Sequence, residues 1–162
     1  MRGTMQPVAT SRSTAGFTLI ELMVVIVIGT ILLAVAIPSY QSQIRRSRRT
    51  DAKTAVLELS GREERFFSTN GAAYSVLPSD MGYTGAFPQA VGSGYYTITV
   101  CSPAGNCDPN ANPPPAPSYY ITATPVAGTS QASDAECTSF SVDSTGQQFA
   151  TGTGTAASCW SR

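Results

Sequence analysis

The chain has 162 residues, of which 12% are charged, and its formal net charge is zero. This length suits one domain with a targeting or anchoring segment. The chain contains no histidine, which removes the usual general base and the commonest metal ligand. We therefore expect no enzyme activity, no bound metal and no cofactor. The lone lysine and the scattered acids offer no alternative catalytic pair.

The charges are distributed unevenly along the chain. Nine of the ten Lys and Arg residues lie at or before Arg65, and the tenth is Arg162. From Asn70 onward this single base faces five acids, a balance of −4 (one minus five): Asp80, Asp108, Asp134, Glu136 and Asp143. Binding to nucleic acid depends on cations that neutralise phosphates. The acidic C-terminal part therefore argues against nucleic acid as a partner.

Residues 17–37 form an apolar run, FTLIELMVVIVIGTILLAVAI, with Glu21 as its one charge. As a helix these 21 residues span about 30 Å, the thickness of a bilayer core. An ordinary secretory signal cut after Ala34-Val35-Ala36 is one alternative, and a plain signal anchor is another. Neither explains Glu21, because an acid within a spanning segment costs about 2.5–3.5 kcal/mol at the centre, and less near an end, and normally has a partner.

The basic residues give a conflicting indication of topology. The five basic residues that follow the apolar run most closely outnumber Arg2 and Arg12 before it: Arg45, Arg46, Arg48, Arg49 and Lys53. The positive-inside rule would place the C-terminal part in the cytoplasm. The cysteines of that part favour an oxidising compartment instead, and we follow the cysteines. The cluster 45–49 is then either a solvated helix face or a surface that contacts acidic lipid head-groups or acids of neighbouring subunits.

The segment GFTLIELMVV, residues 16–25, resembles the processing and assembly signal of type IV prepilins. The similarity continues through AIPSYQ (36–41) and RRSRRTDA (45–52), which resemble PilE-type minor pilins. A weaker similarity covers 140–146 and Cys159-Trp160. One departure is that the leader has only two basic residues, neither of them next to Gly16.

The resemblance implies a role for each residue of the motif. A prepilin peptidase would cut between Gly16 and Phe17 and methylate the new amine of Phe17. Glu21 would pair with the Phe17 amine of a neighbouring subunit during assembly, which would recover part of its desolvation cost. The implied partners are other pilin subunits, the peptidase, the inner-membrane assembly platform and the lipid bilayer.

The helical pattern is expected to resume after a kink at Pro38. An apolar stripe at steps of three and four can pack on a sheet: Ala52, Ala55, Val56, Leu59, Phe66 and Phe67. The charged residues of this stretch, including Lys53 and Glu63, are expected mostly on the other faces. Asn70-Gly71 is a helix stop signal, so we predict one long kinked helix over 17–69.

Four strands are expected after a packed loop at 74–89, because β-branched and aromatic residues gather at 95–101, 119–124, 138–142 and 147–151. Asp143–Gly146 predicts a turn between the last two strands, and 108–117 predicts an irregular proline-rich loop.

The fold class is therefore α+β, the type IV pilin fold, with the helix on a roughly four-stranded antiparallel sheet. The expected regions are 1–16 leader, 17–37 membrane and assembly segment, 38–69 amphipathic helix and 70–162 head.

Four cysteines lie in the head, and their even number predicts two disulfides. A zinc site is disfavoured, because the spacings of 5, 29 and 21 residues lack the close cysteine pairs typical of such sites. We prefer the pairs Cys137–Cys159 and Cys101–Cys107, although the sequence leaves all three connectivities open.

The function expected from this resemblance is structural: a subunit, and by preference a minor pilin, of a type IV pilus that supports pilus biogenesis, twitching motility and adhesion. The subunit would sit in the bacterial inner membrane with one pass and a periplasmic head, and would then enter the extracellular pilus. Two alternatives stay open, a pseudopilin of type II secretion and a DNA-uptake receptor.

Overall fold

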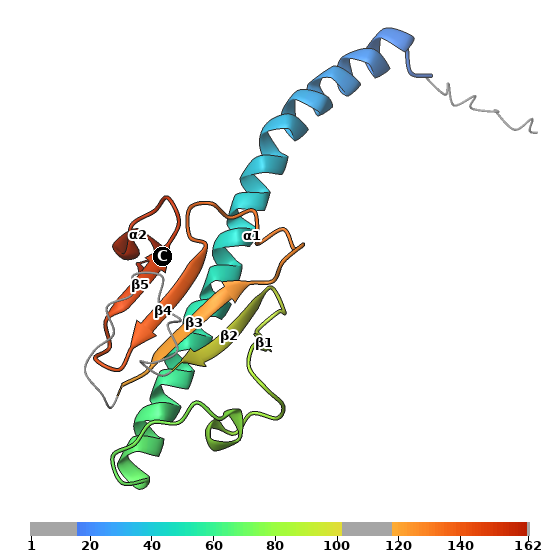
Figure 1. Ribbon diagram of the computed structural model, residues 1–162. Coiled ribbons are helices and arrows are strands. Elements are labelled where there is room, and N and C mark those ends of the chain that lie inside the picture. The colour runs from blue at the N-terminus through green and yellow to red at the C-terminus, as the bar shows by residue number, and fades with distance from the viewer. Residues whose placement is uncertain (1–15, 102–117, 162) are drawn as a thin grey trace, which may run out of the picture. The chain divides into compact units, whose positions relative to one another are not determined.

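The computed structural model describes residues 16–101 and 118–161. Its described part forms two units, one ending at Tyr40 and one running from Gln41. These residues form two helices, a short 3-10 helix and five strands (Figure 1). In chain order the elements are α1 Leu19–Thr69, η1 Pro78–Met81, β1 Gln89–Val91, β2 Tyr96–Cys101, β3 Tyr120–Pro125, β4 Ser139–Asp143, β5 Gln148–Thr151 and α2 Ala156–Trp160.

The five strands form one antiparallel meander in the order β1-β2-β3-β4-β5. The α+β class is thus confirmed, and each of the four expected strands lies within one residue of its predicted start. The count of about four was one strand short, because β1 begins where the expected loop ends. Three residues are too few to show a period-two pattern, and β1 exists as a strand through its pairing with β2.

Helix α1 begins two residues later than predicted and ends where predicted. Its last turn is continued by a bond from the Asn70 amide to the Phe66 carbonyl oxygen (2.9 Å). Gly71 and Ala72 then adopt positive φ angles of 71° and 61°, a left-handed conformation that ends helices. The helix passes through Pro38 without interruption, and the kink there stays a prediction.

The core of the head lies between the later turns of α1 and one face of the sheet (Figure 1). The expected stripe is buried at Ala52, Ala55, Val56 and Leu59, and it shares one cluster with strand residues such as Ile98, Ile121 and Phe140. The other two predicted members are half-buried: Phe66 packs against this cluster, and Phe67 stacks on Tyr74.

The assignment of Lys53 and Glu63 to the polar faces of the helix was wrong. Only 8% of Lys53 and 0% of Glu63 is exposed. Both side chains are drawn inward by groups that are remote in sequence: Lys53 Nζ donates to the Cys159 carbonyl oxygen (3.1 Å), and Glu63 accepts from the Ser75 amide (3.2 Å).

The predicted turn after β4 is organised by one buried carboxylate. Asp143 Oδ1 accepts hydrogen bonds from the amides of Thr145 and Gln147 (both 2.9 Å) and from Thr145 Oγ1 (2.6 Å). Gly146 completes the turn with a φ of 81°, which glycine adopts without strain.

Replacing Asp143 by alanine is expected to lower the free energy of unfolding by about 2 kcal/mol, because the hydrogen bonds of the turn to a charged acceptor are lost. Asp143→Asn keeps an acceptor oxygen and should lose less than half as much. Urea denaturation of the two variants measures the difference. An alanine variant as stable as the wild type would show that the carboxylate does not hold this turn.

Candidate processing and assembly site

The Gly16–Phe17 bond precedes α1 in irregular, exposed chain. The Phe17 side chain is 83% exposed, and a Cβ built on Gly16 would meet no described atom within 4 Å. Neighbouring described residues therefore impose no need for glycine at this position. The Gly16–Phe17 bond is accessible to an enzyme. A requirement for glycine at this position would come from an active site that needs close approach to the backbone.

Thr18 is the N-cap of α1, and its hydroxyl oxygen bonds to the backbone of Glu21 in the first turn. The Glu21 amide donates to Thr18 Oγ1 at 3.2 Å, which satisfies one of the free amides at a helix start. A carboxylate in this turn is also favoured by the partial positive charge of the helix end. Sequence reasoning missed Thr18, although threonine followed three residues later by glutamate is the spacing of a capping box.

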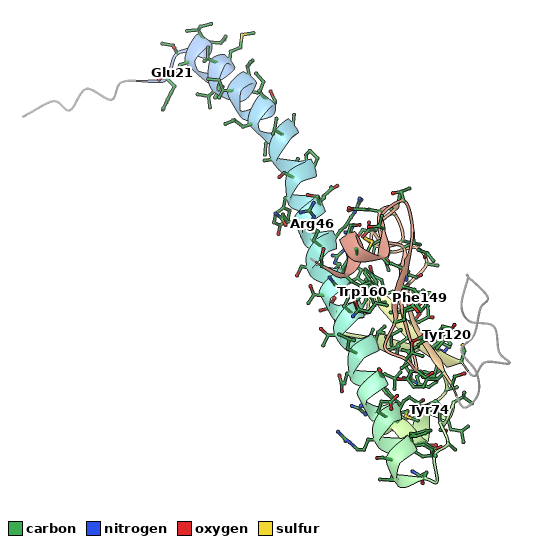
Figure 2. All side chains as sticks on the ribbon, turned by 90° about the vertical axis from the view of Figure 1, so that its left-hand side faces the viewer. Glu21, Arg46, Tyr74, Tyr120, Phe149 and Trp160 are labelled. Carbon is green, nitrogen blue, oxygen red and sulfur yellow. A yellow bond between two sulfur atoms is a disulfide. The ribbon has the colours of Figure 1, made fainter. Side chains whose placement is uncertain are left out.

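The first half of α1 exposes its apolar side chains. From Leu19 to Ile37 the large ones are between 48% and 84% exposed, and Figure 2 marks Glu21 at the start of this stretch. Among the described residues, α1 is the one helix long and apolar enough to cross a membrane, with a mean hydropathy of 2.9 over its best window. So much exposed apolar surface requires lipid or other helices as a partner.

Arg49 forms a buried ion pair with Asp134, from the segment between β3 and β4. Its Nε and Nη2 each donate to one Asp134 oxygen at 2.7 Å, and Nη2 also donates to Glu136 at 2.9 Å. The side chains of Arg49 and Asp134 are 8% and 3% exposed. The hydrogen bond with Asp134 raises the pKa of Arg49 above its ordinary value, although burial opposes the change.

Lys53 and Arg48 are also held by the head. Burial lowers the pKa of Lys53, and Arg49 nearby lowers it further. Arg48 donates to Ser130 Oγ (2.7 Å) and lies 3.4 Å above the ring centre of Tyr95, a favourable cation–π geometry. Of the two alternatives for 45–49, the solvated helix face therefore does not apply to Arg49, which is buried, and applies only in part to Arg48, which is half-buried.

A disulfide joins Cys137 to Cys159, with its Cα atoms 5.8 Å apart, which is the pairing preferred above. It ties α2 to the segment before β4, and Trp160 Nε1 adds a bond to the Phe149 carbonyl oxygen (2.9 Å; Figure 2). Cys101 is also disulfide-bonded, and its expected partner Cys107 lies outside the described residues.

The described part of the chain contains no group of acids and cysteines suited to a metal ion.

An exposed apolar helix start, with later turns that form a core with an antiparallel meander, defines a type IV pilin. The chain belongs to the family described as "Type IV minor pilin ComP, DNA uptake sequence receptor", whose model matches residues 38–141. The model of the prokaryotic N-terminal methylation motif matches residues 11–37.

Similar proteins are structural pilins. The chain is 37% identical to "Type IV major pilin protein PilA" of Myxococcus xanthus, over 57% of this chain and 40% of that protein. It is 38% identical to "Fimbrial protein EcpC" of Eikenella corrodens, over 56% of each. It is 36% identical to "Type IV major fimbrial protein FimA" of Dichelobacter nodosus, over 57% of this chain and 65% of that protein. The matches thus span less than two thirds of these relatives.

Proposed function

We propose that this type IV pilin is a minor pilus subunit that is cut between Gly16 and Phe17 by a prepilin peptidase and N-methylated at Phe17. The mature subunit is then anchored in the bacterial inner membrane, with its head on the periplasmic side, until an assembly platform adds it to the filament. The observation that carries the proposal is the methylation motif over 11–37, which coincides with the exposed Gly16–Phe17 bond and the apolar start of α1.

Glu21 supports the assembly step. Its carboxylate stands within an apolar helix, where an unpaired charge is costly and a nearby amine offsets much of the cost. Cleavage after Gly16 would create such an amine on Phe17, four residues before Glu21. Pairing between subunits would then favour transfer of the helix from lipid into the filament.

Glu21→Gln is expected to reduce incorporation into sheared filaments on the order of a hundredfold, because one partner of a buried ion pair is lost. Cleavage should continue, so the mature chain should accumulate in the membrane fraction. The measurement compares the subunit in filament and membrane fractions by immunoblot.

Thr30→Val is the matched control within the same apolar stretch. Among the described residues, Thr30 Oγ1 donates to the carbonyl oxygen of Val27 in its own helix (2.8 Å), and its loss should leave incorporation unchanged. Normal incorporation of Glu21→Gln would contradict the proposed assembly role.

A second candidate function is DNA reception during uptake, because the description of the matching family names a DNA uptake sequence receptor. Seven of the ten Lys and Arg residues lie along α1, whereas the acidic C-terminal part carries the single base Arg162. Purified protein should then bind double-stranded DNA with an affinity that falls steeply as salt rises. An absence of binding at low salt would exclude this candidate.

The pseudopilin alternative shares the N-terminal signal. The relatives named as fimbrial and pilus proteins favour the pilus instead.

A further inference from the structure

Arg45 and Arg46 differ from the other three basic residues of the stretch 45–53. Arg48, Arg49 and Lys53 are all bound by groups of the head. Neither Arg45 nor Arg46 forms a hydrogen bond or ion pair through its side chain with any residue that the structure describes. Arg46 is exposed on α1 (Figure 2), and Arg45 is half-buried. Two cations of the cluster are thus available to an external anion.

The position of these arginines along α1 matches the far boundary of a bilayer. No charged residue occurs between Glu21 and Arg45, which are 24 positions apart (45 minus 21). At about 1.5 Å per residue this helical separation is about 36 Å, more than the hydrocarbon core of about 30 Å and less than the whole bilayer of about 40–45 Å. A straight helix with Glu21 near one boundary would therefore place Arg45 and Arg46 at the depth of the opposite head-groups.

Arg45 also lines a hollow suited to a phosphate group. The hollow measures about 240 Å³ and is lined by Gln41, Ile44, Arg45, Arg48 and Ser130. It offers guanidinium, amide and hydroxyl donors, and none of its lining residues is a carboxylate. Arg48 has five donor N–H groups, so its bond to Ser130 leaves others for a second acceptor.

The neighbouring hollow, of about 280 Å³, also includes Arg45 and Arg46 in its lining. It contains Asp134 and Glu136, which already neutralise Arg49 and would repel an anion. The acid-free hollow is therefore the better phosphate site.

We propose that Arg45, Arg46 and the acid-free hollow bind the phosphate head-groups of anionic phospholipids while the subunit is anchored in the membrane. Lipid is favoured over nucleic acid because the same helix carries the membrane segment, which holds these arginines at head-group depth throughout the anchored stage. Anionic head-groups attract such basic residues. The inference rests on the membrane-anchored stage of the proposed function.

The test uses the full chain reconstituted into lipid nanodiscs that contain phosphatidylcholine with or without phosphatidylglycerol. Native mass spectrometry of the released protein compares retention of the two lipids. Each of the two arginines near an anionic surface contributes roughly fivefold, so we expect a preference of about twenty-fivefold for phosphatidylglycerol. The double variant Arg45→Gln, Arg46→Gln should lose this preference.

Arg65→Gln is the matched control, because Arg65 is an exposed arginine on the same helix whose side chain pairs with no described residue. It should keep the preference for phosphatidylglycerol. Circular dichroism of each variant verifies that the head is folded.

An unchanged lipid preference in the double variant would overturn the proposal. So would binding of double-stranded DNA through Arg45 and Arg46 with no preference for phosphatidylglycerol. Flotation with neutral vesicles tests the membrane anchor separately. If flotation fails, the membrane stage of the proposed function and the lipid site are both wrong, whereas flotation without the lipid preference contradicts the arginine site alone.

Discussion

Replacing Arg49 by alanine is expected to lower the free energy of unfolding of the head by about 3–5 kcal/mol. The substitution leaves the Asp134 carboxylate buried without its cation, and breaking a buried pair from one side costs about this much. Asp134 also accepts from Gln131 Nε2 (3.0 Å), which in turn donates to the Tyr96 hydroxyl (3.0 Å). The loss would therefore loosen the segment between β3 and β4 as well as its contact with α1.

Urea denaturation of Arg49→Ala, Asp134→Ala and the double variant measures the coupling between the two residues. The double variant should be less destabilised than the sum of the single variants, because neither charge is left alone. Arg46→Ala removes an exposed arginine on the same helix and should change stability by less than about 0.5 kcal/mol. If Arg49→Ala behaves like this control, the ion pair does not stabilise the head.

Glu63 is expected to make the head less stable as the pH rises toward 7. Its side chain is fully buried, Oε2 accepts from the Ser75 amide, and Oε1 has no hydrogen-bond partner in the described part of the chain. Burial raises the pKa of Glu63 from 4.5 to about 7, with smaller contributions from Glu64 and Asp80, while the bond from Ser75 opposes the change. The neutral acid is therefore the favoured form in the folded head.

The sign of the pH effect follows from the raised pKa. Between pH 4.5 and 7 the folded state keeps a proton on Glu63 that the unfolded state has released. The contribution of this group to the free energy of unfolding is therefore complete below pH 4.5 and is lost as the pH rises through 7. The loss from this one group is about 3 kcal/mol.

Unfolding free energies of the wild type and Glu63→Gln, measured from pH 4.5 to 8, test this prediction. Glu63→Gln cannot titrate and should lack this part of the pH dependence. Glu64→Gln is the control, because the exposed Glu64 accepts from the hydroxyls of Tyr74 and Tyr119 (3.0 and 3.1 Å). The Glu64→Gln variant should keep a free energy of unfolding that falls as the pH rises. Parallel profiles for Glu63→Gln and the wild type would show that Glu63 does not titrate in this range.

The long elements could be predicted because their signals are local. The apolar run and the stripe after it predict α1 within two residues at its start, and β-branched and aromatic clusters place four strands. Strand β1 and helix α2, with three and five residues, are too short for a periodic pattern. They depend on tertiary contacts, namely pairing with β2 and the disulfide at Cys159.

The buried charges could not be predicted from local pattern. Arg49 meets Asp134 across 85 positions, and Lys53 meets the carbonyl group of Cys159 across 106. A charged residue within an amphipathic helix ordinarily faces solvent, and only the folded head shows its partner. Gly16, Phe17 and Glu21 could be singled out because their motif is contiguous, and their roles in processing and assembly stay proposals.

The most direct test of the proposed function is the intact mass and N-terminal sequence of the protein from the membrane fraction. Processing as a prepilin predicts a chain that starts at Phe17 and carries one methyl group on its amine. A chain that starts at Ile37 would instead show removal of the apolar helix by an ordinary signal peptidase, and would contradict a pilin function.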